Sequence, residues 1–406
     1  MAQVQLSAFH AVLAQEVQAA RPRPRQLAAG ECRTAEGRPC PICWGRELEY
    51  PQELALKEKA LERWWASNLG RTPREPLLSA SEGRSYRSVT KRRAFAAGRL
   101  GLVDGSGRGV RPLSVARCAI EPELHTRIYA NVEKQLADKK RLSSRLNYVV
   151  LKTHARGTAI ILNLSEASRP VHVEADRLLR NLSSAHPELT AGFLYQASPG
   201  SHYYLDAGGR LERVFGKPRL VVEVAGCRLE YSPLSFSQIH LGMLEPLVDC
   251  ARTMLELDRG TTFWDLYCGY GLFAVALGPL ASRTAGADVS PESIASARAN
   301  ARRNGLARCR FWQGDLRPSM LQCLPTGRPL AVLLDPPRQG PARGLVDRLA
   351  AIGPRRAVHV FCDIDRLPAD LGIWRRRGYA VTRAQPLDLF PGTSSIEVMV
   401  ALARRS

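Results

Sequence analysis

The chain has 406 residues, and its 58 Lys and Arg residues outnumber its 38 Asp and Glu residues to give a net charge of +20. Hydrophobic residues make up 45% of the sequence, which excludes a disordered polymer and predicts folded domains, two or three at this length. The apolar runs are far shorter than the roughly 20 residues of a membrane span. We therefore expect a cytoplasmic protein with no membrane partner.

The positive charge is distributed unevenly along the chain. The net charge is +9 over residues 1–120 (20 basic, 11 acidic), +1 over residues 121–258 (17 basic, 16 acidic) and +10 over residues 259–406 (21 basic, 11 acidic). Cationic surfaces bind polyanions because they release counterions from phosphate backbones. The excess therefore favours a polyanionic partner, and a general bias toward Arg is the alternative explanation.

Cysteine spacing marks the first 120 residues, which are otherwise expected to be rich in loops. Cys32, Cys40 and Cys43 follow a C-x7-C-x2-C pattern, and Cys118 lies further along the chain. The Pro-Ile pair between the second and third cysteines allows a tight turn that presents two thiolates to one metal. Zinc and an iron–sulfur cluster both fit four thiolates. A redox pair or buried structural thiols are the alternatives.

The middle of the chain has the pattern of a mixed α+β region. Short β-like runs alternate with turns between residues 147 and 231. After Gln238 the pattern changes to alternating strands and helices, which predicts a doubly wound α/β domain with a parallel sheet.

A glycine turn and an acid follow the first two strands of this α/β region. The strand at residues 263–267 leads into Gly269 and Gly271, and such a turn lets the backbone approach a ligand closely. Asp288 ends the second strand, where a carboxylate can accept hydrogen bonds from ribose hydroxyls. A dehydrogenase fits this acid equally well, but the third glycine of its phosphate-binding motif is absent. The pattern favours a nucleoside-bearing cofactor.

Four further residues lie at the ends of later strands. Asp315 follows the third strand, in a position suited to an adenine amino group. Asp335 begins a rigid Asp-Pro-Pro-Arg loop after the fourth strand, because two prolines cannot continue a strand. Cys362 follows the fifth strand, where a thiol is either a nucleophile or structural. Glu397 interrupts an apolar strand, and a carboxylate there needs a partner or a catalytic role.

Together these residues resemble a known family. The chain is similar to the RNA uracil-5-methyltransferases that use S-adenosylmethionine, over approximately residues 31–402. The segments that carry the resemblance are Ser235–Gln238, Asp265–Gly271, Leu334–Arg338, Cys362 and Phe390–Glu397. The four spaced cysteines match the ligands of the 4Fe–4S cluster in the branch of the family that acts on 23S ribosomal RNA. The resemblance therefore implies that branch, with RNA as partner.

The resemblance also implies a class I methyltransferase fold and a covalent mechanism. Cys362 is implied as the thiolate that adds to carbon 6 of uracil, and Glu397 as the general base that removes the proton from carbon 5. The target uridine is expected to be single-stranded or flipped out. The cofactor-binding residues are expected both from the resemblance and from residue positions at the strand ends. They are Gln238, Tyr267, Gly269, Gly271, Asp288, Asp315 and Asp335.

The chain departs from the family pattern around both catalytic positions. The family's Ser-Cys-Asn is Phe361-Cys362-Asp363 here, and the carboxylate of Asp363 is expected to raise the pKa of the thiol. Gly392 and Ser395 replace the two histidines that precede the base in the family. A catalytically inactive RNA-binding protein, and a methyltransferase of transfer RNA or another base, are therefore the alternative functions.

We expect three domains and a monomer. Residues 1–120 are expected to hold the cluster and contact RNA, residues 121–235 to form the α+β domain, and residues 236–406 to form the catalytic domain. We hypothesise that the two basic ends of the chain face each other across the RNA, with the middle region as a scaffold.

Overall fold

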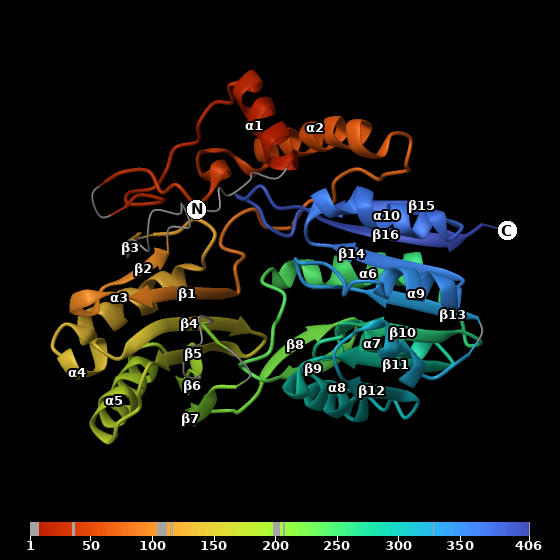
Figure 1. The fold of residues 1–406 in the computed structure, drawn as a ribbon. Helices are drawn as coiled ribbons and strands as arrows, with labels where there is room; N and C mark the ends of the chain where they lie inside the picture. Colours follow the sequence, from red (N-terminus) through yellow and green to blue (C-terminus); the bar gives the residue numbers. More distant parts are fainter. Residues whose placement is uncertain are drawn as a thin grey trace.

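The computed structural model describes residues 8–405 except 35–36, 104–111, 114, 116, 198–203, 206–207 and 328. In Figure 1 one large sheet lies at the lower left and a second at the right, and helices α1 (Ala8–Ala20) and α2 (Tyr50–Leu69) lie above the second sheet. The second sheet is the doubly wound one, and it positions most of the predicted site.

The C-terminal sheet has seven strands in the order β12-β11-β10-β13-β14-β16-β15. β10 to β14 are parallel, as the sequence predicts, whereas β16 is antiparallel to both of its neighbours, β14 and β15. Because its direction is reversed, β16 begins at the edge where the parallel strands end. The strands are β10 (Thr262–Leu266), β11 (Arg283–Asp288), β12 (Cys309–Gln313), β13 (Leu330–Leu334), β14 (Arg356–Phe361), β15 (Tyr379–Leu387) and β16 (Glu397–Arg404).

Helices cover both faces of this sheet because its strands are apolar on both sides. On β10, Phe263 packs into one core with α6 (Leu244–Leu255), α7 (Leu272–Leu277) and α8 (Pro291–Arg303). The next residue, Trp264, packs into the opposite core with α9 (Leu345–Ile352) and α10 (Leu367–Arg376). The doubly wound α/β class is therefore confirmed.

The N-terminal helices pack on the same face of the sheet as α9 and α10. Phe9 of α1 and Trp64 of α2 are buried in the core that also contains Trp374 of α10. The expectation that the first 120 residues are mainly loops is therefore wrong for the 20 residues of α2. Two charged residues, Glu53 and Lys57, lie on the buried face of this helix and interrupt the apolar period that would have predicted it.

The other large sheet has the order β3-β2-β1-β4-β5-β6-β7 and is antiparallel except at the β5–β6 pair. Helices α3 (Glu123–Leu136), α4 (Lys140–Ser143) and α5 (Arg169–Ala185) share a core with it. The strands are β1 (Val89–Ala94), β2 (Leu100–Val103), β3 (Pro112–Leu113), β4 (Leu146–His154), β5 (Gly157–Leu164), β6 (Leu189–Gln196) and β7 (Arg210–Gly216). Strands from both sides of residue 120 thus pair in one sheet, and the expected division into three domains stays a prediction.

The remaining described elements are short. Strands β8 (Leu220–Val224) and β9 (Cys227–Tyr231) form a small hairpin before the C-terminal sheet. The 3-10 helices are η1 (Trp44–Glu47), η2 (Ala96–Gly98), η3 (Leu241–Met243), η4 (Gly278–Leu280), η5 (Pro318–Cys323) and η6 (Ile364–Arg366). Among the helices that the structure describes, none combines the length and the apolar character needed to cross a membrane.

Candidate active site

The edge of the C-terminal sheet brings the two predicted catalytic residues together. Cys362 directly follows β14, and Glu397 is the first residue of β16. In the register of these two strands Phe361 pairs with Val398, so the next positions outward are Cys362 and Glu397. The reversed direction of β16 places the start of that strand where β14 ends. The structure therefore groups the predicted nucleophile and the predicted base.

Asp335 completes an acid–thiol cluster, which we define as Cys362, Glu397 and Asp335. Asp335 follows β13, the strand beside β14, and the Cys362 thiol lies 4.0 Å from the carbonyl oxygen of Pro336. Burial raises the pKa of the Cys362 thiol to about 11, with further contributions from Glu397 and Asp335. Arg338, from the same proline-containing loop, lowers the pKa of the thiol. The thiol is therefore protonated at neutral pH before anything binds.

The two carboxyl groups of the acid–thiol cluster are also perturbed. Burial raises the pKa of Asp335 to about 7. Glu397 is only 6% exposed, and burial together with the charge of Asp335 raises the pKa of Glu397 well above its usual range. Desolvation and like charge both favour the neutral acid, whereas a cation that enters the site favours the carboxylate. The protonation of the cluster therefore depends on what binds beside it.

The effect expected of Asp363 has a different origin. The pKa of Cys362 is indeed raised, but its causes are burial, Glu397 and Asp335. The Asp363 carboxylate instead accepts the backbone N–H of Asp365 at 3.2 Å and caps η6. Consecutive side chains after a strand point in different directions, so proximity in sequence does not predict proximity of the two groups.

A second group of predicted residues forms an open cradle at the ends of β10 and β11. The Asp288 carboxylate accepts the backbone N–H of Gly269 at 3.0 Å and that of Ser290 at 2.8 Å. Gly269 has a φ of +53°, and a Cβ there would meet no atom within 4 Å, so its backbone faces open space. At Gly271, with a φ of +89°, a Cβ would meet Ala297 of α8 at 3.2 Å. Doubly wound folds bind nucleosides at this position.

Tyr267 and Asp315 border the same region. Tyr267 has a φ of +63°, and its hydroxyl oxygen accepts the backbone N–H of Ala342 at 3.3 Å. Burial raises the pKa of the Tyr267 phenol, and the charges of Asp315 and Asp288 add to this effect. Asp315 is exposed, and its carboxylate pairs with Arg317 at 2.6 Å. A ligand that bonds to Asp315 would therefore compete with this ion pair.

Gln238 lies on the segment that joins the β8–β9 hairpin to α6. Its backbone carbonyl accepts the Ser88 hydroxyl at 3.3 Å, and Lys152 of β4 donates to the carbonyl of Ser235 at 2.9 Å. The central sheet therefore holds this segment. Within the described part of the chain, no hydrogen bond joins the Gln238 side chain to the Asp288 cradle.

Asp265 is a functional candidate to which the sequence analysis assigns no role. It is fully buried in β10, and burial raises the pKa of its carboxyl group well above the usual range. Its Oδ2 accepts the backbone N–H of Ala274 at 2.8 Å, while Oδ1 has no partner among the described atoms. The sequence signal that could have identified Asp265 is a single acidic residue within an apolar strand. Asp265 holds the first turn of α7 and, through it, the glycine turn.

The four predicted cysteine ligands lie around one cavity, although they come from distant parts of the chain. Cys32, Cys40, Cys43 and Cys118 line a space of about 310 Å³, which we call the cysteine cavity. Burial raises the pKa of the Cys43 thiol to about 12, and Cys40 and Cys32 contribute to this shift. The structure therefore brings together the set that the sequence spacing predicts.

The lining of the cysteine cavity carries both thiols and positive charge. Cationic side chains share its wall with the thiols, and they are suited to offset thiolate charge. A single zinc ion needs thiolates about 2.3 Å away. Across the residues that the structure describes, no three Cys, His, Asp or Glu side chains converge closely enough to hold one metal ion. The cations are Arg46, Arg87, Lys91 and Arg93.

The chain is similar in sequence to known RNA methyltransferases. No family model matches the chain. An uncharacterised RNA methyltransferase of Geobacter sulfurreducens is 27% identical over 408 residues, which cover 97% of the chain and 80% of that protein. RlmD, a 23S rRNA (uracil(1939)-C(5))-methyltransferase, is 32% identical in Edwardsiella ictaluri and 37% identical in Alkalilimnicola ehrlichii. These two matches cover 55% and 45% of the chain, and 50% and 41% of the relatives.

Among solved structures, the tRNA (uracil-54, C5)-methyltransferase of Pyrococcus abyssi in complex with S-adenosyl-L-homocysteine superposes with a TM-score of 0.71. The two proteins are 20% identical, and the match covers 90% of the chain and 87% of that protein. The fold is therefore that of the class I S-adenosylmethionine-dependent methyltransferases. By sequence, the chain is similar to RNA methyltransferases along nearly its whole length, in agreement with the resemblance that the motifs predict.

The raised pKa of Cys362 predicts slow alkylation of this thiol at neutral pH. The thiolate is the reacting form, so the rate rises about tenfold per pH unit until the pH approaches 11. Asp335→Asn removes a neighbouring negative charge and is expected to increase the rate at about pH 9, a pH at which Asp335 is ionised. Iodoacetamide labelling, followed by mass spectrometry of the peptide that contains Cys362, measures the rate.

Asp363→Asn is the matched control, because its carboxylate caps η6 and is expected to leave the alkylation rate unchanged. Full reactivity of Cys362 at pH 7, or equal effects of the two substitutions, contradicts the electrostatic origin of the shift.

Proposed function

We propose that the protein transfers a methyl group from S-adenosylmethionine to carbon 5 of a uridine in 23S rRNA. The observation that carries the proposal is that Cys362 and Glu397 follow the Phe361–Val398 pair outward from β14 and β16, at the sheet edge that also holds the Asp288 cradle of a class I methyltransferase fold. The similarity to RlmD proteins supports uracil carbon 5 as the target. The protein acts as a monomer in the cytoplasm.

Carbon 5 of uracil must be activated before it can accept a methyl group. The Cys362 thiolate forms a bond to carbon 6, and the electron pair of the 5,6 double bond shifts to form an enolate. The thiol must first lose its proton. Glu397 has to remain able to accept a later proton, so we assign this first proton to Asp335, whose pKa of about 7 leaves it partly ionised at neutral pH.

Carbon 5 of the enolate then takes the methyl group that S-adenosylmethionine supplies, and the electron pair of the broken sulfur–methyl bond stays on the sulfur of the leaving S-adenosylhomocysteine. Glu397 removes the hydrogen from carbon 5 as a proton, and the electron pair of that C–H bond restores the 5,6 double bond. The bond between carbon 6 and Cys362 breaks, and the thiolate leaves. The raised pKa of Glu397 makes it a stronger base once it is ionised.

The cradle residues fit the cofactor that the fold implies. The open space over Gly269 admits a ligand against the backbone, and Asp288 keeps acceptor capacity for ribose hydroxyls. Gly271 keeps α8 close to the turn. Asp315 would meet the adenine end, while Tyr267 lines the same region. Asp335 orients the base or the cofactor, and Gln238 would close the site from the connecting segment.

The cysteine cavity is proposed to hold a 4Fe–4S cluster through Cys32, Cys40, Cys43 and Cys118. Four thiolates are the usual ligands of such a cluster, and a space of about 310 Å³ with a cationic wall suits its size and negative charge. The cluster would add metal–thiolate bonds between segments that already share backbone hydrogen bonds, such as that from the Cys32 N–H to the Arg117 carbonyl at 2.8 Å. Zinc is the alternative occupant.

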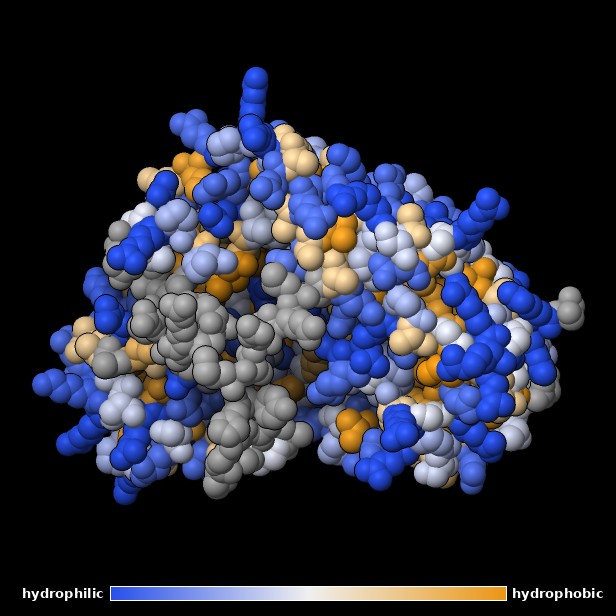
Figure 2. Space-filling view, turned by 45° about the horizontal axis from the view of Figure 1, so that its top comes forward, coloured by the Kyte–Doolittle hydropathy of each residue, from blue (hydrophilic) through white to orange (hydrophobic). Residues whose placement is uncertain are grey.

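The RNA is proposed to lie along the cations that border the cysteine cavity. Lys91 of β1 stacks over the ring of Tyr204 at 3.9 Å, and Arg93 follows it on the same strand. Hydrophilic side chains dominate the molecular face shown in Figure 2. Phosphates can be held by such cations, while the target base enters the acid–thiol cluster. That the two basic ends of the chain face each other across the RNA stays a prediction.

RNA that carries 5-fluorouridine is expected to trap the enzyme covalently. Fluorine at carbon 5 cannot be removed as a proton, so the bond between Cys362 and carbon 6 persists after methyl transfer. A band of protein joined to RNA should form in denaturing gels only when S-adenosylmethionine is present, and Cys362→Ala should abolish it. Absence of both adduct and methyl transfer, while RNA still binds, would favour the alternative of an inactive RNA-binding protein.

The identity of the metal group can be tested on the purified protein. Protein purified without oxygen should be brown and contain about four iron and four sulfide ions per chain. Cys43→Ser should lose iron and colour, whereas Cys323→Ser, at an exposed thiol outside the cysteine cavity, should retain both. Colourless protein with one zinc ion per chain contradicts the iron–sulfur assignment.

Removing cations beside the cysteine cavity should weaken RNA binding without changing sequence preference. The double variant Lys91→Gln, Arg93→Gln is expected to lower the slope of log affinity against log salt by about 1 to 2, because up to two phosphate contacts are lost. Fluorescence anisotropy at several salt concentrations measures the slope. Arg180→Gln, at an exposed position of α5 where the arginine already pairs with Asp176 at 2.8 Å, is the control. An unchanged slope contradicts this RNA path.

A further inference from the structure

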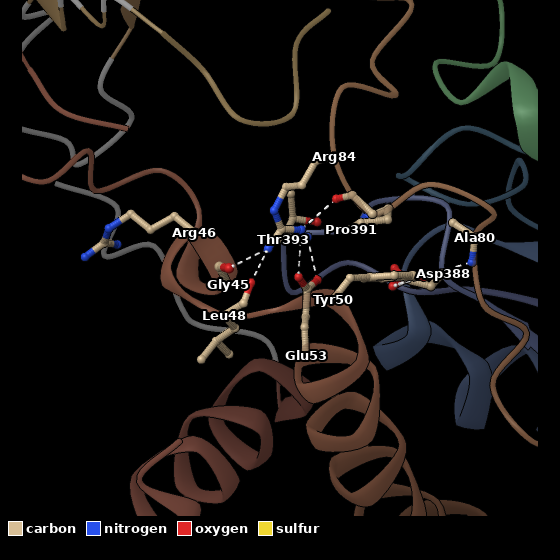
Figure 3. Close-up of polar contacts among 12 residues, drawn as sticks. Gly45, Arg46, Leu48, Tyr50, Glu53, Ala80, Arg84, Asp388, Pro391 and Thr393 are labelled. Carbon is tan, nitrogen blue, oxygen red and sulfur yellow. Dashed lines mark hydrogen bonds and ion pairs between the residues drawn. The ribbon is translucent and has the colours of Figure 1, made fainter. Parts of the chain in front are cut away.

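The segment that leads into Glu397 is held by the N-terminal region of the chain. This segment, residues 388–396, joins β15 to β16 and contains Gly392 and Ser395, the two positions where family histidines are replaced. Figure 3 shows it against the start of α2 and the η1 loop. We call residues 388–396 the base segment, because Glu397 follows it directly.

Glu53 of α2 is the centre of these contacts. It is fully buried, and its carboxylate accepts the backbone N–H of Gly392. The same carboxylate pairs with Arg84 at 3.1 Å and with Lys57 at 2.9 Å. A buried carboxylate is stable only when its charge and its lone pairs are both satisfied. The base segment thus supplies one of the groups that Glu53 requires.

A second buried acid fixes the beginning of the base segment. Asp388 is 0% exposed, and its Oδ1 accepts a hydrogen bond from Lys57 Nζ at 2.9 Å. Its Oδ2 accepts the hydroxyl of Tyr50 at 3.2 Å, as Figure 3 shows. Lys57 therefore bridges the two buried acids, Glu53 and Asp388. One cation shared by two acids ties the position of α2 to the position of the base segment.

The same contacts extend to the cysteine cavity. Arg84 Nη2 donates to the carbonyl of Gly45 at 2.7 Å, and the Gly45 N–H donates to the carbonyl of Gly392 at 3.1 Å. Gly45 lies two residues after Cys43. A Cβ at Gly392 would lie 3.9 Å from the Cys43 Sγ and 3.2 Å from Ile120. The backbone of the base segment therefore borders the cysteine cavity.

We infer that Glu53 is a positioning residue that sets the place of Glu397 through the base segment. The network of Glu53, Lys57, Arg84 and Asp388 contains two buried acids and two cations, so displacement of one member leaves a charge without its partner. This constraint orders the base segment from outside the C-terminal sheet. The inference rests on the proposed function only where it names Glu397 as the base. The positional claim stands on the contacts.

The two catalytic steps should respond differently if this inference is correct. Addition of Cys362 and methyl transfer require β14 and the cofactor cradle, which Glu53 does not contact. Removal of the proton from carbon 5 requires Glu397 in place. Glu53→Gln should therefore slow the release of methylated RNA at least tenfold more than it slows methyl transfer. The covalent complex between enzyme and methylated RNA should accumulate on unmodified substrate.

The experiment is a single-turnover reaction with radiolabelled S-adenosylmethionine, followed by denaturing gels that separate adduct from free methylated RNA. Glu397→Gln is the reference for a missing base. Glu62→Gln, at an exposed acid on the same helix, is the matched control and should behave as the natural protein. Gly392→Ala disturbs the base segment sterically, at a φ of +84°, without removing a buried charge, and should also accumulate adduct.

A second readout does not require methyl transfer. Glu397 raises the pKa of Cys362, so displacement of Glu397 should increase the rate of Cys362 alkylation at about pH 9. Faster alkylation in Glu53→Gln and Gly392→Ala, but not in Glu62→Gln, is the expected result. If the natural protein transfers methyl groups but these two variants neither accumulate adduct nor alkylate faster, the inference is overturned. If the natural protein transfers none, the proposed function fails, and the alkylation result still decides the inference.

Discussion

The reversed direction of one strand, β16, determines which side chains meet at the edge of the C-terminal sheet. Five parallel strands deliver their carboxyl ends to one edge of the C-terminal sheet, and β16 enters between β14 and β15 in the opposite direction. Its first residue, Glu397, therefore lies at the edge where Cys362 ends β14. A parallel strand at this position would carry Glu397 to the far edge. The proposed nucleophile and the proposed base are grouped by topology, although they lie 35 residues apart in the chain.

Burial raises the pKa values of the residues in the acid–thiol cluster. Each member of the acid–thiol cluster has a pKa above its usual value, mainly because of burial, and this favours the protonated forms of groups that the proposed reaction needs ionised. A sulfonium cation bound at this edge would favour the ionised forms, because opposite charges attract. We therefore expect the thiol of the free site to be alkylated slowly. Reactivity is expected to appear only when cofactor and RNA are both bound.

Much of the fold could be predicted from the sequence, because strand–helix alternation and turn residues act locally. The strand ends carried Asp288, Asp335 and Cys362 to the expected edge, and the cysteine spacing predicted one shared cavity. α2 was missed because its buried face carries Glu53 and Lys57, which satisfy each other only in the folded protein. The prediction that Asp363 raises the pKa of Cys362 named the wrong cause, since the direction of a side chain after a strand is not visible in the sequence.

Charge counting also has a physical limit. Residues 121–258 carry a net charge of only +1, yet four of their cations line a single cavity of about 420 Å³ beside the central sheet. A sum over a segment conceals such local convergence, because paired and unpaired charges count equally. The net charge of the middle region is near zero only as a sum over the whole segment. The cations are Arg156, Lys217, Arg219 and Arg228.

Cys362 and Glu397 are proposed to act together in the methylation of carbon 5 of a uridine in 23S rRNA. The most direct measurement is mass-spectrometric mapping of 5-methyluridine in ribosomal and transfer RNA from cells with and without this gene. The account predicts one 5-methyluridine of 23S rRNA that disappears on deletion, returns with the natural gene, and does not return with Cys362→Ala. An unchanged 23S rRNA, or loss of a different modification, would contradict it.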